Sequence, residues 1–264
     1  MFLSWIWLID GLIMGADISL FFAFAAVYYQ VIKTGAATGL SLQTLSIVVF
    51  TRIVHLFSHP MDLHFEPTMI PYWTYTIFDI LNSSFGAFLL YYIFARLLST
   101  YEVNLDNFGE GFSPITIGDH STVLSRIISR VAVSLTFSSG LGLIWWFFRR
   151  SRQAFAASFF TCFYEVLGAV ALFPQLWMFQ KTRVASPQLA NFVAMIALNR
   201  LCTLTFWIVY PWIFQWRYPD NRGIQMASEV LNLVIISDFL YYYLKAKYRG
   251  ESSVRIPNRD IDEV

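Results

Sequence analysis

The sequence predicts an all-α, polytopic membrane protein with seven transmembrane helices. Of its 264 residues, 57% are hydrophobic and 13% are charged, which is far too apolar for a soluble domain of this length. The apolar residues form seven runs, and a helix needs about 20 such residues to cross a bilayer. Polar, glycine-containing or proline-containing breaks separate the runs, so composition and spacing predict the same fold class.

The first three runs cover about residues 3–32, 40–58 and 70–98. The first run is too long for the core of a signal peptide and no soluble chain follows it, so we interpret it as a retained transmembrane helix. Gly35 and Gly39 bracket the first turn. Prolines punctuate the second connection, at Pro60, Pro67 and Pro71.

The other four runs cover about residues 122–148, 153–180, 188–214 and 223–247. The connection at about residues 99–120 is acidic, contains glycine and asparagine, and is the longest. Short basic or polar turns separate the later runs. We expect the polar tail that follows Lys247 to be mobile.

Two arginines inside apolar runs indicate an internal duplication. Arg52 follows Gly39 by 13 residues, and Arg200 follows Pro187 by the same 13 residues. We therefore predict one transmembrane domain, residues 1–247, built from two three-helix repeats at about 1–98 and 153–247. A single connector helix at about 122–148 would leave both repeats in the same orientation, which makes the repeat parallel. A cytosolic tail, residues 248–264, follows.

The distribution of basic residues near the ends of the runs predicts the orientation. With the N-terminus in the lumen and the C-terminus in the cytosol, the cytosolic side holds the larger set: Lys33, Arg96, Arg126, Arg130, Lys181, Arg183, Lys245, Lys247, Arg249, Arg255 and Arg259. The lumenal side holds the smaller set: Arg149, Arg150, Arg152, Arg217 and Arg222. The cluster at 149–152 argues for the opposite orientation.

Charges within the apolar runs are candidate functional residues, because an isolated charge in a membrane helix is costly. The candidates are Asp17, Arg52, Asp79, Glu165, Arg200, Glu229 and Asp238. The alternative is that these groups pair with one another and only hold helices together. For Arg52 and Arg200 we favour function, since guanidinium groups bind carboxylates in a bidentate manner. Two arginines at equivalent depth would form a cationic pocket, and Trp207, on the same helix face as Arg200, would form its wall.

Composition and residue spacing also argue against several classes of function. The net charge of +1 gives no reason to expect nucleic acid as a partner. Cys162 and Cys202 lie within apolar runs, and no Cys/His spacing typical of a metal site occurs. No Ser/His/Asp, paired-Asp or metal constellation stands at usable spacing. We therefore expect no enzymatic activity, no metal and no cofactor.

Several segments, in order, carry a family resemblance. The stretch Leu172-Phe-Pro-Gln-Leu176 is followed by Lys181-Thr182. The other segments are Gly39–Ser41, Val49–Arg52, Leu105–Phe108, and Ser237–Phe239 with Tyr241–Tyr243 and Lys245. Together they resemble the KDEL receptor family, within the wider PQ-loop group that includes the SWEET sugar transporters. The resemblance covers most of the chain.

The resemblance implies a receptor of the endoplasmic reticulum and Golgi membranes. Such receptors bind the C-terminal Lys/His-Asp-Glu-Leu tetrapeptide of escaped lumenal proteins in the acidic Golgi and release it in the neutral endoplasmic reticulum. Arg52 and Arg200 match the arginines that grip the signal's carboxylates, and Trp207 matches a pocket tryptophan. Asp238 matches a last-helix aspartate linked to transport, and Asp17 matches the aspartate of a first-helix Asp-x-Ser.

The sequence departs from the family at several of these positions. The family's first-helix histidine, a proton sensor, falls on Leu20. Its pocket-locking glutamate and tyrosine fall on Gly168 and Asn199, with Glu165 one turn from Gly168. The standard pH switch is therefore absent.

His55 stands where the family has the aspartate that meets the first residue of the signal. It lies three residues after Arg52, on the same helix face, and an imidazole titrates between about pH 5 and 8. We hypothesise that protonated His55 adds positive charge beside Arg52, so that an anionic peptide end binds better in acid. The alternative is an interfacial histidine without a role.

The basic tail and the shared architecture each allow a further interpretation. In the family, basic residues of the tail engage the retrograde coat. Without the resemblance, we interpret the basic residues of the tail as the ordinary excess of positive charge on the cytosolic side of a membrane helix. The second candidate function is a PQ-loop transporter that moves a small anion or amino acid through the cavity between Arg52 and Arg200, because receptors and transporters share this architecture.

Overall fold

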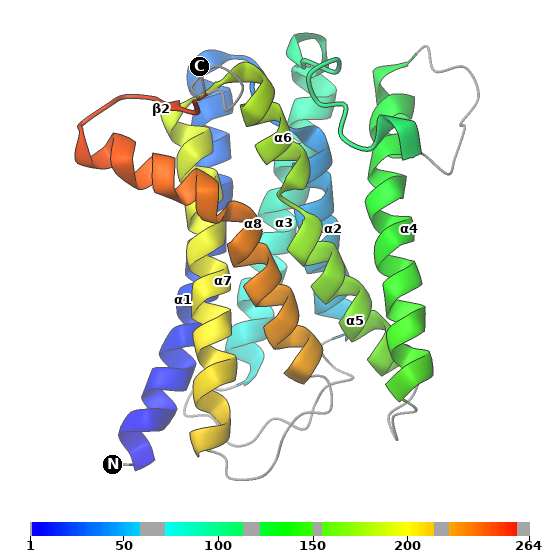
Figure 1. The fold of residues 1–264 in the computed structure, drawn as a ribbon, viewed down its shortest axis with the longest axis vertical. Coiled ribbons are helices and arrows are strands. Elements are labelled where there is room, and N and C mark those ends of the chain that lie inside the picture. Colours follow the sequence, from blue (N-terminus) through cyan, green and yellow to red (C-terminus); the bar gives the residue numbers. More distant parts are fainter. Residues whose placement is uncertain (1, 59–71, 113–121, 150–154, 214–221, 258–264) are drawn as a thin grey trace, which may run out of the picture.

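The computed structural model describes residues 2–58, 72–112, 122–149, 155–213 and 222–257, which form a helical bundle (Figure 1). Six of the helical spans are long and apolar enough to cross a membrane, and a shorter apolar helix of 17 residues accompanies them. The prediction of an all-α, seven-span membrane protein is confirmed.

The first half of the chain contains α1 (Phe2–Thr34), α2 (Leu42–Ser58) and α3 (Tyr72–Arg96). α1 ends where Gly35 adopts a φ of 60°, and Gly39 adopts a φ of 74° just before α2. These values lie in the left-handed region that glycine enters without a steric cost. The two glycines therefore bracket the first turn as the sequence predicts.

The described part of the long connection after α3 is structured. It contains the short 3-10 helices η2 (Leu98–Thr100) and η3 (Glu110–Phe112), and α4 (Val123–Arg149) follows it. Residues 113–121 of this connection lie outside the described residues, as do the second connection with its prolines and the basic residues Arg150 and Arg152.

The second half contains α5 (Phe155–Val170), α6 (Phe173–Thr182), α7 (Pro187–Ile213) and α8 (Arg222–Tyr248). The sequence predicted one helix at 153–180, and the structure has two. Pro174 lies at the start of α6. Because proline lacks a backbone N–H and clashes with the preceding turn, it cannot continue α5 but is well suited to begin a new helix.

The two halves have the same internal order. In the first, α3 contacts both α1 and α2; in the second, α8 contacts both α5 and α7. α1 packs along α7 and α2 along α5, which joins the halves, and α4 packs on α5 and α2. The chain ends lie at opposite ends of the bundle, as an odd number of crossings requires (Figure 1). This arrangement supports the interpretation of a parallel duplication.

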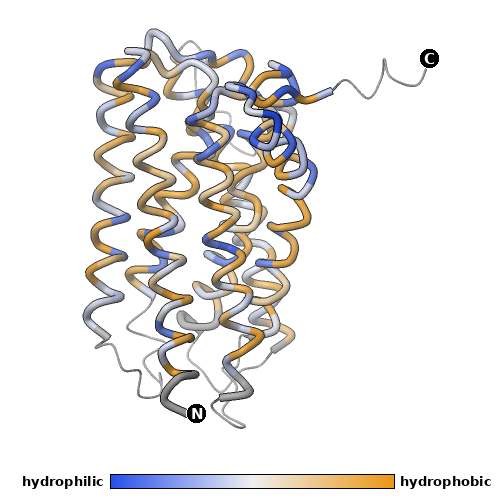
Figure 2. Tube along the Cα trace, turned by 90° about the vertical axis from the view of Figure 1, so that its left-hand side faces the viewer, coloured by the Kyte–Doolittle hydropathy of each residue, from blue (hydrophilic) through white to orange (hydrophobic). Residues whose placement is uncertain are grey.

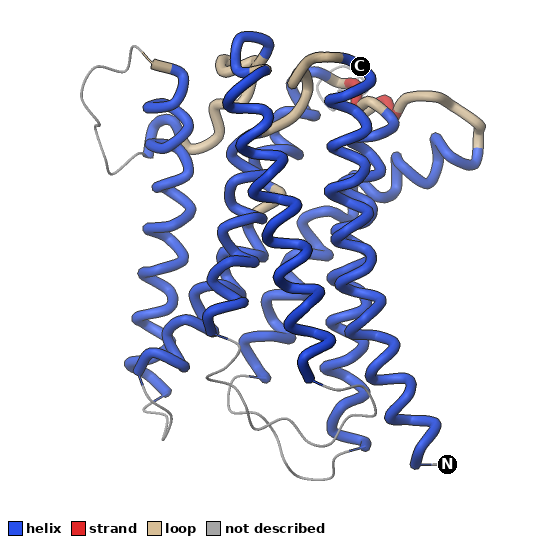
Figure 3. The backbone as a smooth tube through the Cα atoms, turned by 180° about the vertical axis from the view of Figure 1, so that it is seen from behind, coloured by secondary structure: helices blue, strands red, loops and turns tan. Residues whose placement is uncertain are grey.

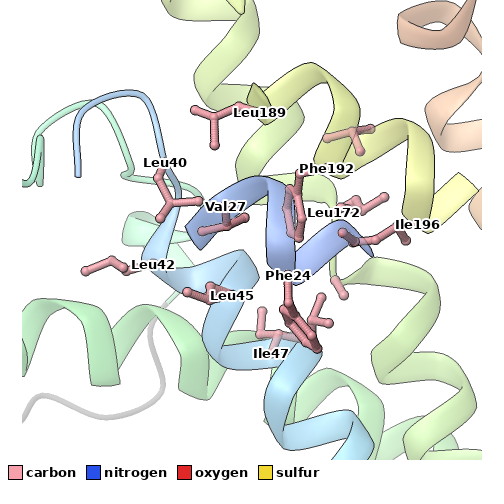
Figure 4. Packing of buried hydrophobic residues seen from close by; sticks show 14 of the residues in the cluster. Phe24, Val27, Leu40, Leu42, Leu45, Ile47, Leu172, Leu189, Phe192 and Ile196 are labelled. Carbon is pink, nitrogen blue, oxygen red and sulfur yellow. The ribbon is translucent and has the colours of Figure 1, made fainter. Parts of the chain in front are cut away.

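The hydrophobic core lies where the two halves meet (Figure 4). Phe24 of α1, Leu45 of α2, Leu172 of the α5–α6 turn and Phe192 of α7 are all fully buried within one cluster. Truncating a buried phenylalanine to alanine typically costs about 3–5 kcal/mol. The pairing of the halves is therefore held mainly by apolar packing.

Polar residues concentrate at the end of the bundle that carries the C-terminus (Figure 2). There β1 (Val184–Ala185) pairs antiparallel with β2 (Val254–Arg255) (Figure 3). The expectation of a mobile tail after Lys247 is thus wrong for residues 249–257. The backbone N–H groups of residues 249–251 donate to carbonyls of α8, and β2 and the N–H of Ile256 bond to the β1 region, which fixes the path of the segment.

Candidate functional site

Arg52 lies at the centre of a buried polar group that we call the first arginine cluster: Asp17, Arg52, His55 and Asp79. The Nη1 atom of Arg52 lies 3.7 Å from Oδ1 of Asp17 and 3.7 Å from Oδ1 of Asp79. His55 Nδ1 lies 3.1 Å from the other carboxylate oxygen of Asp79. Three helices, α1, α2 and α3, contribute to the cluster. Both carboxylates are buried, where a charge is stable only if it is paired.

The second arginine cluster comprises Glu165, Arg200, Ser228 and Glu229. Arg200 Nη1 donates to Glu229 Oε1 at 3.0 Å. Ser228 Oγ donates to Glu165 Oε2 at 2.8 Å, and Glu165 interacts electrostatically with Arg200. Here α5, α7 and α8 contribute, which are the counterparts of α1, α2 and α3 in the other half.

The two clusters lie close to each other across the α2–α5 interface. Glu229 interacts electrostatically with Arg52, and Glu165 with His55. The rings of His55 and Tyr164, the neighbour of Glu165, meet edge to face with centroids 5.1 Å apart. The sequence-predicted residues Arg52, His55, Asp17, Glu165 and Arg200 are therefore brought together in one region of the bundle.

The sequence anticipated a cationic pocket, and the structure instead pairs each arginine with carboxylates. Each cluster holds one arginine and two carboxyl groups, so acidic groups outnumber the guanidinium groups in both. Arg200 Nε and Glu229 Oε2 are buried and lack a hydrogen-bond partner among the described residues. The second cluster thus retains unused hydrogen-bonding capacity, which buried polar groups normally satisfy.

The two positions where the family's pocket-locking pair would stand have different roles here. A Cβ added to Gly168 would lie 2.5 Å from Nη2 of Arg200, so the guanidinium packs directly on the backbone of α5. Asn199 Nδ2 donates to the carbonyl of Ala16 at 2.7 Å and ties α7 to α1. Neither position supplies a carboxylate to Arg200, which pairs with Glu229 and interacts electrostatically with Glu165.

Trp207 and Asp238 lie apart from the paired charges. Trp207 is buried in a small apolar cluster with Ile6 and Ile9 of α1 and with Phe206 and Tyr210 of α7. Asp238 is exposed on α8, nine residues beyond Glu229 and so about 13 Å further along the helix. Their roles as pocket wall and transport residue stay predictions.

Sequence reasoning counted Asp79 and Glu229 as intramembrane charges but assigned them no role. The spacing of the charges along the chain does indicate a role for these two residues. Asp17 and Glu165 are 148 positions apart, the separation of Arg52 and Arg200, while Asp79 and Glu229 are 150 positions apart. The duplication thus extends from the arginines to both carboxylates of each cluster.

Asp10 was missed altogether. It is fully buried in α1 and accepts a hydrogen bond of 2.8 Å from the hydroxyl of Tyr75 on α3. Its place close to the start of the first apolar run gave no reason to treat it as an intramembrane charge.

A separate polar network lies at the C-terminal end of the bundle and centres on Asp106. This carboxylate accepts hydrogen bonds from Ser41 Oγ at 2.8 Å, Gln43 Nε2 at 3.1 Å and the Tyr101 hydroxyl. Burial, followed by the nearby Asp106 carboxylate, raises the pKa of the Tyr101 phenol, so the hydroxyl keeps the proton that it donates. Arg130 of α4 donates to the carbonyls of Val103 and Asp106.

Gln175, of the Pro-Gln pair, joins this network to α6. Its amide Nε2 donates to the carbonyl of Gly39 at 2.8 Å, and its Oε1 accepts from the backbone N–H of Ser41 at 2.8 Å. Its own N–H donates to Thr44 Oγ1 at 2.9 Å. The residues that carry the family resemblance here thus fix the start of α2 to α6.

Comparison with known proteins assigns the chain to a family. The model of the family described as ER lumen protein retaining receptor matches residues 36–210. The chain is 23% identical over 223 residues to the ER lumen protein-retaining receptor of Dictyostelium discoideum, covering 84% of this chain and 87% of the relative. It is 24% identical over 241 residues to ER lumen protein-retaining receptor 2 of Homo sapiens, covering 89% and 93%. Since the family match spans more than half of the sequence, this chain belongs to the ER lumen protein-retaining receptor family.

Proposed function

We propose that this protein is a receptor that binds the C-terminal retrieval signal of lumenal proteins in the Golgi and returns them to the endoplasmic reticulum. Its membership of the family is the observation that carries the proposal. The receptor binds a peptide end and changes conformation, and it performs no bond chemistry. Its N-terminus is lumenal and its C-terminus cytosolic. This orientation places the larger set of basic residues near the helix ends on the cytosolic side of the membrane.

The two arginine clusters are the proposed recognition site. A retrieval signal presents a terminal carboxylate and acidic side chains, and guanidinium groups bind carboxylates by charge-assisted, bidentate hydrogen bonds. In the structure, Arg52 lies at ion-pair distance from Asp17 and Asp79, and Arg200 donates a single hydrogen bond to Glu229. Signal binding is therefore an exchange in which peptide carboxylates replace those of the protein.

Acid favours this exchange. A protonated carboxylate no longer attracts an arginine strongly, so protonation within either cluster makes a guanidinium available to the peptide. His55 contributes in the same direction, because a protonated imidazole forms a full ion pair with Asp79 and competes with Arg52 for it. The receptor thus regains a pH response without the family's first-helix histidine.

The experiment that tests the proposal is direct binding of the purified protein to a panel of C-terminal tetrapeptides, each with an amidated control. Binding is measured at about pH 5.5 and about pH 7.4, which bracket the histidine range. We expect tight, acid-favoured binding that requires the free carboxylate. Equal binding of the amidated peptides would reject the arginine–carboxylate mechanism.

Two substitutions locate the site. Arg52→Ala and Arg200→Ala should each weaken binding at least about 30-fold, because truncating one partner of a buried charge pair costs about 2 kcal/mol or more. Arg96→Ala, at the exposed end of α3, is the control and should bind as the unmodified protein does. Thermal melting of each variant distinguishes lost recognition from lost folding.

Two parts of the sequence analysis remain separate proposals. The basic residues of the tail, which include Lys245 and Lys247, would engage the retrograde coat in the cytosol. A transporter of small anions or amino acids shares the architecture, but the relatives carry receptor names. Substrate uptake into proteoliposomes, with no tetrapeptide binding at either pH, would favour the transporter.

A further inference from the structure

A pocket of about 650 Å³ lies at the C-terminal end of the bundle, remote from the arginine clusters. One wall is the last part of α8, and the other is the tail that returns from it. Its charged residues are Lys245, Arg249, Arg255 and Glu251, so positive groups outnumber negative ones by two. Ser252 and Ser253 add hydroxyl groups. The lining is that of a site for a phosphate-bearing anion.

The wall of the pocket that belongs to α8 is amphipathic. The C-terminal part of α8 leaves the bundle at an angle to the other helices (Figures 1 and 3). Tyr241, Leu244 and Tyr248 are exposed along one stripe of this part, at spacings of three and four. A stripe of exposed aromatic and apolar residues on a helix that also carries lysines is typical of a segment at a membrane surface.

The pocket lies on a neighbouring stripe of the same helix. Tyr242, Lys245 and Ala246 line it, again at helical spacing, and Arg249 follows directly after the helix. Lys245 Nζ lies 5.7 Å from the ring centre of Tyr241, which places a cation directly between the apolar stripe and the pocket. A ligand in the pocket would therefore lie beside the acyl chains of the bilayer.

The wall formed by the tail is fixed in place. Gly250 adopts a φ of 69° and allows the chain to reverse after α8. The N–H of Ile256 donates to the carbonyl of Arg183 at 3.0 Å, and Arg183 Nη1 donates to the carbonyl of Pro257 at 3.1 Å. With Val254 buried and β2 paired to β1, the backbone that carries Arg255 is fixed in the tail wall of the pocket.

We propose that this pocket binds the phosphorylated headgroup of an anionic phospholipid in the leaflet at the C-terminal end of the bundle. Lys245, Arg249 and Arg255 contact the phosphate groups, and Ser252 and Ser253 donate hydrogen bonds. The stripe of Tyr241, Leu244 and Tyr248 lies against the acyl chains. Lipid binding would hold the tail against α8 and is independent of the retrieval-signal site.

The test measures lipid bound to the full chain in nanodiscs. One nanodisc contains phosphatidylcholine alone, a second adds a phosphatidylinositol phosphate, and a third adds phosphatidylserine at the same total charge. The variant Lys245→Gln/Arg255→Gln should bind the phosphatidylinositol phosphate about 25-fold more weakly, because each basic residue at a membrane surface contributes about fivefold. The phosphatidylserine nanodisc should show little binding.

The control variant is Lys33→Gln/Arg96→Gln. It removes the same charge from the last turns of α1 and α3 at the same end of the bundle, and Lys33 likewise lies near a tyrosine ring. It should bind the lipid as the unmodified protein does. An equal loss in the control, or equal binding of phosphatidylserine, would show diffuse surface attraction and overturn the proposal. Binding of free inositol phosphate as tightly as of the lipid would assign the pocket to a soluble anion instead.

Discussion

Gly168 and Arg200 are in direct contact, because the guanidinium of Arg200 occupies the space where a side chain on residue 168 would begin. A Cβ at this position would lie 2.5 Å from Nη2 and 3.3 Å from Cζ of Arg200. The glycine on α5 is therefore a requirement of the second arginine cluster. It allows an arginine of α7 to approach Glu229 of α8 within the bundle.

Gly168→Ala should displace the guanidinium of Arg200 and weaken binding of the retrieval signal. The protein should also lose about 1–3 kcal/mol of stability, the usual cost of an extra methyl group in a packed site. Peptide titration and thermal melting measure the two effects. Gly140→Ala in α4 is the control, since its added Cβ would have nothing within 4 Å; if it weakens binding equally, the contact with Arg200 is not the cause.

Glu229→Gln should raise affinity for the signal at neutral pH. The glutamine keeps an oxygen for Arg200 but removes the charge that competes with peptide carboxylates. We expect an increase of about tenfold near pH 7.4, equivalent to about 1.4 kcal/mol, and no change in acid. Glu110→Gln, which alters an ion pair of 3.1 Å with Arg130 away from the clusters, should leave affinity unchanged. A drop in neutral-pH affinity for Glu229→Gln would mean that the carboxylate supports binding.

His55→Ala should reduce the ratio of acid to neutral affinity, because Asp79 then has no imidazole to pair with in acid. His55→Phe separates charge from packing, since it keeps a ring against Tyr164 but cannot be protonated. Both variants should show the same reduced ratio over pH 5.5–7.4, the range in which an imidazole titrates. An unchanged ratio in either variant rejects a role for His55 in the pH response.

Gln175→Leu should destabilise the fold without changing the arginine clusters. It removes two hydrogen bonds and leaves the carbonyl of Gly39 and the N–H of Ser41 without their partner, at about 1–3 kcal/mol for each buried group. Thermal melting in detergent measures the loss. Gln180→Leu, on the exposed side of the same helix, should stay within about 0.5 kcal/mol of the unmodified protein. Equal melting temperatures for the two variants would contradict this account.

The break between α5 and α6 does not follow from the apolar composition of the segment. Pro174 was visible, yet the apolar run at 153–180 continued through it, and one long helix was expected. Apolar composition indicates that a segment lies in the bilayer. It does not indicate whether the backbone hydrogen bonds of one helix continue through the whole segment. A proline interrupts that ladder locally, and the two helices together still complete one crossing.

The spans were predictable because each depends on a local property. Inside the bilayer there is no water, so the backbone N–H and C=O groups of a segment must form hydrogen bonds within its own helix. The side chains of that helix must be apolar over about 20 consecutive residues. The turn at Gly35 and Gly39 is equally local. The matched positions of Arg52 and Arg200 and the order of the short motifs can be read directly from the chain, and the motifs indicated the family. The sequence by itself thus determined the fold class and the first turn, and it singled out Arg52 and Arg200.

The tertiary structure alone decided which charges meet. Asp79 lies on α3 and Glu229 on α8, and their matched spacing in the chain does not indicate that each pairs with an arginine of another helix. The contact of Gly168 with Arg200 and the return of the tail to β1 likewise join positions far apart in the chain. Ion pairing depends on distance in space, and in a bundle that distance follows from how the helices pack rather than from their order.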